Sequence, residues 1–514
     1  MSSKSTSAAR DSPYGPNRKR RARSANTKHN LSYRPKIELL EDRRMLAIVT
    51  WDGGGDAVSW HDPANWDTDV LPGDVDDVII DLPNDNTIEV TNDVLVNSVN
   101  SQEFVNIFSV STFTVNSDST FAGGVTVSAS STLNGTGDIT LDGSSFTGGN
   151  GRIDGTGRLT VAAGAELNVV SSQTTIVSRT TDVFGTLAIS SPANDFSGPR
   201  LVLDGVGDQV VVHAGGVMHL KGAAIISATS EGRILNEGSL LRTGPGIVQL
   251  TAEVDNRGDA QLLGGELQIN GGGSSSRAIN VEADATLNLR GGFSFTSPVA
   301  VTGEGRLEIT GGAHDFTGSD ILVSGSATFV SSTVTIANTL PAELEIDQIR
   351  VSTVIFNADQ TVDSVDADFG TISGSGNLTF TGMSRFNQSR LTGTGAVIFA
   401  EASTINVFSL GVTIEPPVEN KGHVRAFGDA RFNQGLVNRP EATFELLNSA
   451  SESFTAAPLV NEGTLRKTGD GQALFSSTSF IENHGSIEVA SGELILPAGS
   501  TTTSIDVPID TTLR

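Results

Sequence analysis

The sequence repeats itself, and this constrains the fold more than any other feature. The stretch Ile234–Leu240, Ile-Leu-Asn-Glu-Gly-Ser-Leu, returns at Leu459–Leu465 as Leu-Val-Asn-Glu-Gly-Thr-Leu. The later match of Asn256-Arg-Gly with Asn483-His-Gly is shifted by two further positions. Two residues were therefore gained inside an otherwise matched block. A chain tolerates this when it consists of stacked local units, because an insertion then bulges only one loop.

A smaller unit of about 20 residues lies inside the long repeat. Gly135-Thr-Gly-Asp-Ile-Thr-Leu returns one unit later as Gly155-Thr-Gly-Arg-Leu-Thr-Val, and related pieces return after slightly shorter or longer steps. Stretches such as Val125-Thr-Val and Leu159-Thr-Val alternate apolar and polar residues with the period of a β-strand. A variable step with this alternation predicts an all-β fold, a right-handed parallel β-helix (β-solenoid) of about 20 coils with about 20 residues each.

Composition narrows the class further. The hydrophobic content of 37% is enough for a core, there are 57 Gly residues, and there is no Cys. Disulfides and thiolate metal sites are therefore excluded. No segment has the roughly 20 consecutive apolar residues that a membrane-spanning helix needs.

Charge is divided unevenly along the chain. The net charge is −26, but residues 1–48 hold 12 Lys and Arg against 4 Asp and Glu, so this segment is positive and the remainder is more strongly negative. An acidic body repels nucleic acid and anionic lipid, and we expect no nucleic-acid partner for it. Divalent cations or neutral sugars are the partners that this charge favours.

The sequence predicts three regions. Residues 1–48 form a basic, largely disordered export or sorting region, residues 49–87 a Trp-rich N-terminal capping module, and residues 88–514 the solenoid, with a joint near 271–276 or 339–345. Every Trp of the chain, namely Trp51, Trp60 and Trp66, falls within the capping module. The open end of a stack exposes apolar residues and unpaired backbone groups, and bulky aromatic side chains cover such an end well. An exposed platform on which a ligand stacks is the alternative.

Two short segments resemble known proteins. Leu40-Glu-Asp-Arg-Arg-Met-Leu46 resembles the Leu-Glu-Pro-Arg-x-Leu-Leu region near the N-terminus of large planctomycete-type exported proteins, with Asp42 in the place of Pro and Met45-Leu46 in the place of the Leu pair. The Trp-Asp-Gly, Asn-Trp, Pro-Gly and Asp-Asp-Val elements of residues 51–78 resemble a module that opens many bacterial β-solenoid surface proteins with adhesin-like repeats. The resemblance implies a secreted or cell-surface location.

Asn-x-Gly recurs at five steps of the repeat. Asn tolerates left-handed backbone and bonds the main chain at turns, and Gly fits where a Cβ would clash. We expect these amides to form a structural ladder along the stack, with no catalytic role. The five residues are Asn236, Asn256, Asn420, Asn461 and Asn483.

Calcium is the one metal that the sequence suggests, and no cofactor is certain. Gly148-Gly-Asn-Gly-Arg-Ile-Asp154 is similar to a calcium-binding nonapeptide, but its Asp is one position late and the motif is not in tandem. Calcium also binds carboxylates in irregular loops. The weak candidate ligands, which solvated turns explain equally well, are Asp74, Asp76, Asp77, Asp363, Asp366 and Asp368.

Signals for catalysis are few. The seven His residues form no His-Glu-x-x-His motif, and His213 and His219 have no carboxylate close by in the sequence. The Gly-x-Gly pairs precede strands rather than the helix of a dinucleotide site. We therefore nominate no catalytic and no cofactor-binding residue.

These patterns favour a non-enzymatic, secreted or cell-surface structural or adhesion protein with a long acidic β-solenoid. Its partners would be extracellular matrix, cell-surface components or glycans. The alternative is a polysaccharide lyase or glycoside hydrolase on a parallel β-helix. A third hypothesis is that the chain is part of a longer protein, because it stops shortly after the strand-like Ile505-Asp-Val507.

Overall fold

The structure is a computed structural model of the chain. It describes residues 47–83, 85–170, 173–190, 200–204, 208–228, 232–341, 344–408, 411–497, 504–507 and 511–514. All of these residues belong to one compact unit, Leu46–Arg514. The predicted disordered tail and the export-type segment before residue 47 lie outside the described residues.

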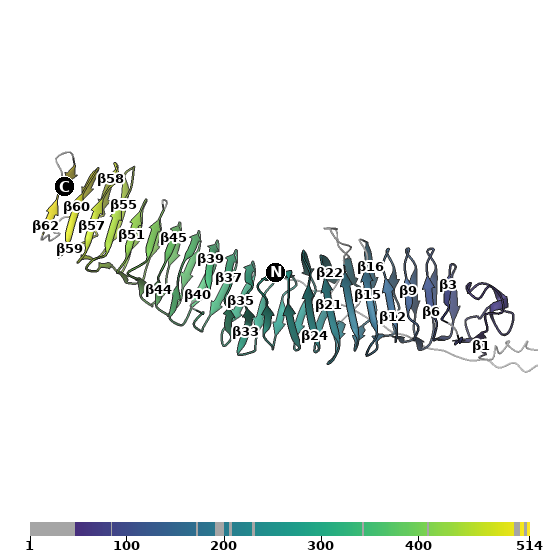
Figure 1. Cartoon of the computed structure of the whole chain (residues 1–514). Coiled ribbons are helices and arrows are strands. Elements are labelled where there is room, and N and C mark those ends of the chain that lie inside the picture. Colours follow the sequence, from purple (N-terminus) through teal and green to yellow (C-terminus); the bar gives the residue numbers. More distant parts are fainter. Residues whose placement is uncertain are drawn as a thin grey trace, which may run out of the picture. The chain divides into compact units, whose positions relative to one another are not determined.

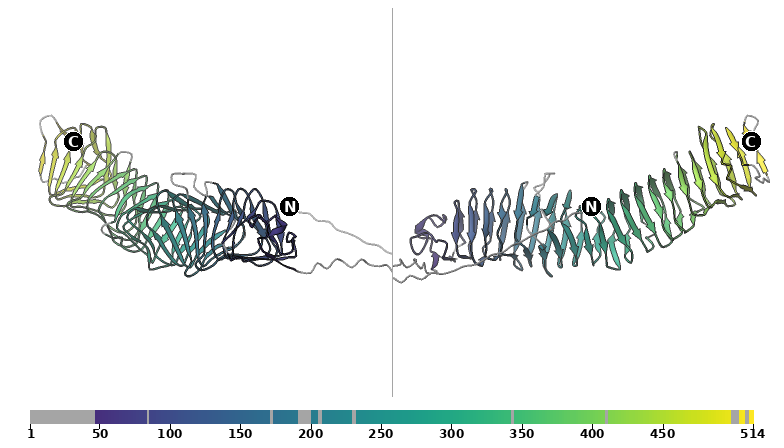
Figure 2. Two further views of the ribbon diagram at one scale, coloured as in Figure 1. Left: turned by 45° about the vertical axis from the view of Figure 1, so that its right-hand side comes forward. Right: turned by 180° about the vertical axis from the view of Figure 1, so that it is seen from behind.

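The described chain is a parallel β-solenoid of about 20 turns, which confirms the predicted fold class. Each coil has three short strands: β2 (Asp77–Ile80), β3 (Thr87–Val90) and β4 (Val94–Val96) are followed by β5 (Ser98–Ser101), which lies beside β2. β2 and β5 pair in parallel, with Asp77 opposite Ser98. Figure 1 shows strands of successive coils standing side by side along the unit, and Figure 2 shows the same order from two other directions.

Four parallel sheets result from this stacking. Sheet A starts at β1 (Ile48–Trp51) and has 23 strands in the described part of the chain. Sheet C runs from β4 to β62 (Ser504–Asp506). The third side of the coil is shared by sheet B, from β3 to β36 (Asp320–Val323), and sheet D, from β41 (Gln360–Val362) to β59 (Ile481–Asn483).

Alternation of buried and exposed residues builds the core. In β7 (Thr112–Val115) the side chains of Phe113 and Val115 point inward and are fully buried, while the two Thr residues are partly exposed. The same alternation continues through the buried Val, Ile, Leu and Phe residues of the other strands. Because each inward side chain contacts those one coil before and after, burial is shared along the stack. Each buried large aliphatic side chain contributes about 1.5–3 kcal/mol before the entropy of ordering is subtracted.

Sheets B and D are separated by one coil without a strand on this side. Between β38 (Thr333–Ile336) and β39 (Glu345–Arg350), Leu340 and Leu344 still fill the core. Pro341 has no N–H to donate to a ladder. The side chain of Gln360 replaces part of the missing pairing, since its Oε1 accepts from Leu340 N at 2.8 Å and its Nε2 donates to the carbonyl of Asn338 at 2.9 Å.

The other stretch that we predicted to be irregular is ordered. Gly273–Ser275 forms β29, which pairs with a strand on each side in sheet A. Backbone hydrogen bonds need no large side chain, and Ser275 supplies a buried hydroxyl where the two preceding coils have Asn. Sheet A therefore continues through 271–276.

The three Trp rings lie at the start of the stack. Trp51, Trp60 and Trp66 are at most 1% exposed, and Trp66 makes edge contacts with both other rings at centroid distances of 4.9 and 4.8 Å. The Trp60 ring packs edge-on against Phe113 of the core at 5.0 Å. Rings buried in this way cover the first coils and offer no open face on which a ligand could stack.

Candidate functional site

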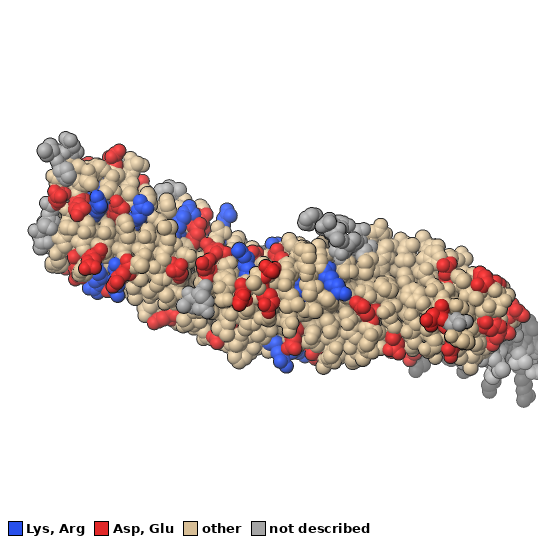
Figure 3. All heavy atoms as spheres, viewed as in Figure 1, with Lys and Arg blue, Asp and Glu red and all other residues tan. Residues whose placement is uncertain are grey.

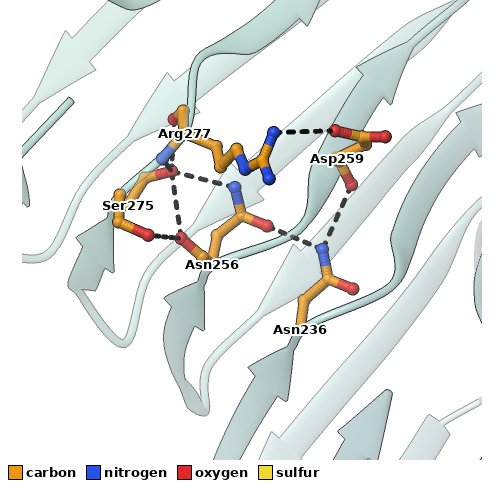
Figure 4. Close-up of polar contacts among 6 residues, drawn as sticks. Asn236, Asn256, Asp259, Ser275 and Arg277 are labelled. Atoms are coloured by element: carbon orange, nitrogen blue, oxygen red, sulfur yellow. Dashed lines mark hydrogen bonds and ion pairs between the residues drawn. The ribbon is translucent and has the colours of Figure 1, made fainter. Parts of the chain in front are cut away.

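The Asn residues of the repeat form columns of side-chain amides inside the stack. Asn236 ends β23 (Arg233–Asn236) and donates from Nδ2 to Asn256 Oδ1 at 2.6 Å. Asn256 in turn donates to Ser275 Oγ at 2.9 Å. Asn236 also donates to the carbonyl of Asp259, at the start of the strand after the next corner (Figure 4). All three side chains of this column are almost completely buried.

A longer column follows in sheet D. Asn420 donates to Asn438 at 2.7 Å, Asn438 donates to Asn461 at 2.7 Å, and Asn461 donates to Asn483 at 2.6 Å. The Asn-x-Gly pattern missed Asn438, because Arg-Pro follows it. Its position in the coil would have identified it: Asn438 lies 18 residues after Asn420 and 23 before Asn461.

The Gly two residues after the Asn is required by close packing between coils. A Cβ at Gly258 would lie 2.1 Å from the carbonyl oxygen of Gly238, one coil earlier, and a Cβ at Gly485 would lie 2.0 Å from that of Gly463. The corners therefore stack backbone against backbone. This explains why Asn and Gly recur together.

The two copies of the long repeat occupy different sides of the coil. Asn236 ends a strand of sheet A and leads into β24 (Ser239–Thr243) of sheet B, whereas Asn461 ends β56 (Leu459–Asn461) of sheet D and leads into β57 (Thr464–Lys467) of sheet C. Eleven steps along sheet A lead from β23 to β55, and β56 is the next strand. The repeated unit is thus a corner with its strand, and it is not tied to one side.

Each copy of the unit places one cation inside the core. Arg242 is fully buried, and its guanidinium donates to the carbonyl of Gly246 at 2.8 Å and to that of Pro245 at 3.2 Å. Burial lowers the pKa of Arg242 to about 10. Lys467, the matching residue of the second copy, is also fully buried and donates to the carbonyl of Gly469, and burial lowers its pKa. In both copies the Gly-x-Gly corner supplies acceptors to the cation.

A third buried cation, Arg179, spans coils. Its Nη1 and Nη2 donate to the carbonyls of Gly137 and Gly135 at 2.7 and 2.8 Å, and its Nε donates to Asp154 O at 2.7 Å. A Cβ at Gly155 would lie 2.6 Å from Arg179 Nη2, so the arginine passes beneath that corner. Burial lowers its pKa, and nearby Asp138 and Asp154 oppose this effect. The Gly-Thr-Gly steps that define the short repeat therefore serve as a carbonyl site for an arginine.

Among the Asp residues proposed as calcium ligands, the side chain of Asp77 bonds to the next coil and that of Asp76 to its own turn. Asp77 accepts from Asn97 Nδ2 at 2.7 Å and from Ser98 Oγ at 2.5 Å, and Asp76 accepts from Gly73 N at 2.8 Å. Asp74 follows Gly73 in the same turn.

The second group of proposed calcium ligands bonds to side chains of the next coil. Asp366 forms an ion pair with Arg385 at 3.0 Å, Asp368 accepts from Asn387 at 2.7 Å, and Asp363 accepts from Thr381 Oγ1 at 3.3 Å. Among the described residues, no group of three or more His, Cys, Asp or Glu side chains is arranged to hold a metal ion.

His213 has a carboxylate partner that its sequence neighbourhood did not reveal. Asp182, 31 residues earlier, accepts from His213 Nε2 at 2.8 Å, and it also accepts from Arg158 Nε at 2.5 Å. Phe184 stacks on the His213 ring at 4.2 Å. His219 instead contacts Thr243 Oγ1 at 2.9 Å. The absence of a carboxylate near His213 in the sequence did not exclude this partner, because stacking brings together residues one coil apart.

One pair of carboxylates lies close together on the outer face of sheet C. Asn288 Nδ2 donates to Glu266 Oε1 at 2.9 Å and to Glu308 Oε2 at 3.0 Å. Burial, and next the negative charge of Glu266, raise the pKa of Glu308. Arg306, two residues before Glu308 in the same strand, and Glu345 line part of a shallow pocket of about 330 Å³.

The same outer face carries alternating charges farther along the stack. Arg385, Arg425 and Arg466 occupy one column of sheet C together with Asp366, Glu445 and Glu488. Beside this column, Phe408 and Phe427 stack at 4.9 Å and an interplanar angle of 4°. Arg385 lies over the first ring at 5.1 Å and Arg425 over the second at 5.2 Å.

Comparison with protein-family models, with curated proteins and with solved structures gave no match. No helix in the described ranges is long and apolar enough to cross a membrane.

Proposed function

We propose that this protein is a non-enzymatic structural or adhesion protein, secreted or displayed at the cell surface, that presents its stacked faces to matrix, cell-surface components or glycans. One observation carries the proposal. The most reactive polar groups inside the stack hold it together: the buried arginines Arg179 and Arg242 and the amide columns bond from coil to coil. Such an arrangement favours a durable repeating surface over a reaction centre.

The charge of the surface supports the same proposal. Residues 47–151 contain no Lys or Arg, and Figure 3 shows acidic side chains without basic ones at the end that holds β3 and β6 (Phe104–Ile107). A surface of one sign keeps copies apart and soluble and attracts cationic or neutral partners. The N-terminal resemblance to exported planctomycete-type proteins adds the cell surface as the proposed place of action.

Surface labelling of intact cells tests this proposal. A membrane-impermeant amine reagent and protease treatment of whole cells should label and cleave the full chain, and the purified protein should bind matrix or glycans on an array without altering them. The calcium dependence of binding is measured in parallel, with and without a chelator. A protein that is protected inside intact cells, or that turns over the glycans it binds, would contradict the proposal.

One observation favours the alternative, a carbohydrate-active enzyme. The oxygens of Glu266 and Glu308 that share Asn288 lie no more than about 6 Å apart, near the separations that glycosidases use, and a raised pKa suits a proton donor. A turnover screen on plant and algal polysaccharides decides the matter. Activity that Glu308→Gln abolishes and that Glu282→Gln retains would establish the enzyme, and no activity with any substrate would leave the scaffold proposal in place.

A further inference from the structure

The outer face of sheet C between β42 (Val365–Asp368) and β57 is charged in a pattern that is complementary to itself when reversed. One residue per coil forms a column, and neighbouring members are register partners in adjacent strands. The column reads Asp366, Arg385, Asn406, Arg425, Glu445 and Arg466. The signs are therefore negative, positive, neutral, positive, negative and positive.

Reversal of this column pairs opposite charges. If two copies face each other in antiparallel orientation, with the midpoint between Asn406 and Arg425, then Asp366 lies opposite the partner's Arg466 and Arg385 lies opposite the partner's Glu445. A parallel arrangement in register would instead place like charges together. Either arrangement can form an isologous, closed dimer, but only the antiparallel one places opposite charges together.

The apolar part of the face follows the same symmetry. Phe408 and Phe427 follow the two central strands, β48 (Thr404–Val407) and β51 (His423–Ala426), and both are partly exposed. The reversal that pairs the charges brings each of these rings opposite the other ring of the second copy. Two Phe rings at the centre, bordered by charges, have the arrangement of an interface core and its rim.

The face is open to water in the described structure. Arg385, Arg425 and Arg466 have side chains that are 44%, 37% and 47% exposed, and Asp366 is 40% exposed. Figure 3 shows basic and acidic side chains interspersed in this part of the molecule, unlike the all-acidic end near β3. Since much of the body is negative, a mixed face is where two copies can approach each other with least repulsion.

We propose that two copies of this chain pair side by side, in antiparallel orientation, through the outer face of sheet C between β42 and β57. Six coils span only about 24 Å along the stack, so the interface is small and the dimer is weak and reversible. This inference goes beyond the proposed function, which does not depend on it.

Charge reversal tests the pairing by sedimentation of the full chain at rising concentration and about 0.15 M ionic strength. The unaltered protein should dimerise, and Arg385→Glu alone or Glu445→Arg alone should weaken dimerisation about tenfold or more, because each places like charges together at both symmetric contacts. An equimolar mixture of the two variants should recover the dimer, because both mixed contacts are again of opposite sign. Arg277→Glu changes a still more exposed arginine, which forms an ion pair on another side of the coil; it is the control and should change nothing.

Cross-linking gives the orientation independently of these variants. The chain has no Cys, so a single introduced cysteine reacts without background. Asn406→Cys, near the symmetry centre, should be joined to its copy by a short bismaleimide, and Thr328→Cys, on the same column but outside the face, should not. A protein that stays monomeric at every concentration, a mixture that does not recover dimerisation, or a cross-link at residue 328 would overturn the proposal.

Discussion

Two copies of one sequence unit, Asn236–Gly246 and Asn461–Gly471, can be compared inside this molecule. Each starts with an amide in a buried column, continues through a strand with one inward cation, and ends at a Gly-x-Gly corner. The first leads from sheet A to sheet B and the second from sheet D to sheet C. The sequence unit therefore encodes a corner and its following strand, and three-sided stacking allows that corner at more than one position.

The two copies differ in how well the cation is satisfied. Arg242 reaches carbonyls of the corner and of neighbouring coils, including Leu220 O at 3.4 Å and Glu266 O at 3.4 Å. Lys467 has one carbonyl acceptor in its corner, Gly469 O. The five donors of a guanidinium can bridge several coils, whereas an ammonium acts as a point charge. The stability of the first copy should thus depend more strongly on Arg242 than that of the second copy depends on Lys467.

Removal of the cations should give the largest difference in unfolding free energy between the two copies. Arg242→Met leaves several buried carbonyls without a donor, and we expect it to cost about 4 kcal/mol of unfolding free energy. Lys467→Met should cost about 1 kcal/mol, because the methionine fills the space and one acceptor is lost. Denaturant unfolding with hydrogen exchange of the two strands measures both. Equal losses would show that the two cations are interchangeable. The unfolding free energy of Arg242→Lys should lie between those of the native protein and the methionine variant.

Variants of the two amide columns should show the next largest difference in stability. Asn438→Ala interrupts the four-residue column: Asn420 loses its ladder acceptor and keeps only Thr443 O, and Asn461 Oδ1 loses the donor of Asn438. This should cost about 3 kcal/mol. Asn236→Ala removes one ladder bond at the end of the shorter column and should cost about 1 kcal/mol. Thermal unfolding followed by circular dichroism compares them. Asn483→Ser is the control, since Ser275 already ends the other column, and a loss as large as that of Asn438→Ala would contradict the ladder's role.

Acidification should destabilise the coil that contains His314, which lies between the two copies of the sequence unit. His314 is buried beside Phe316, donates from Nε2 to the carbonyl oxygen of Gly311 at 2.8 Å, and has a pKa that burial lowers below 6.5. Because the folded state holds the ring neutral, its contribution is present above pH 6.5 and is lost as pH falls from there toward the folded-state pKa. Hydrogen exchange at 313–316 between about pH 7 and pH 5 measures the loss. His314→Gln should remove this local pH dependence, and unchanged dependence would exclude His314 as its source.

Surface ion pairs beside the amide columns should matter least. Arg439 bridges Glu419 at 2.6 Å and Glu462 at 3.3 Å in the second region, and Arg257 pairs with Asp255 at 2.6 Å in the first. We expect about 0.5 kcal/mol for Arg439→Ala and less for Arg257→Ala, because both side chains are half exposed. Both effects should shrink in high salt. An effect above that of Asn438→Ala would show that the surface, not the columns, holds the coils together.

The features of the fold that depend on local residue spacing could be predicted from the sequence. Coil length, parallel stacking and the Asn-x-Gly corners follow from alternation and from Gly positions, because each coil contacts mainly its neighbours. Asn438 was missed since Pro440 replaces the Gly that marks the other corners.

Partners that come from other coils could not be predicted. The donors of Arg179 reach carbonyls up to 44 residues away, and the carboxylate of His213 comes from 31 residues earlier. The register that brings these partners together depends on the length of every coil that lies between them. The Trp rings, in contrast, are close in sequence and were readily recognised as one cluster.

The direct test of the account is whether residues one coil apart are neighbours. In this Cys-free chain, Thr140→Cys with Thr160→Cys places two cysteines at register partners on the outer face of sheet A. Strand neighbours lie about 4.8 Å apart, within disulfide range. We expect this pair to oxidise to an intramolecular disulfide, while Thr132→Cys with Thr140→Cys, closer in sequence but on different sheets, stays reduced. Closure of the second pair, or of neither, would contradict a stack of parallel coils.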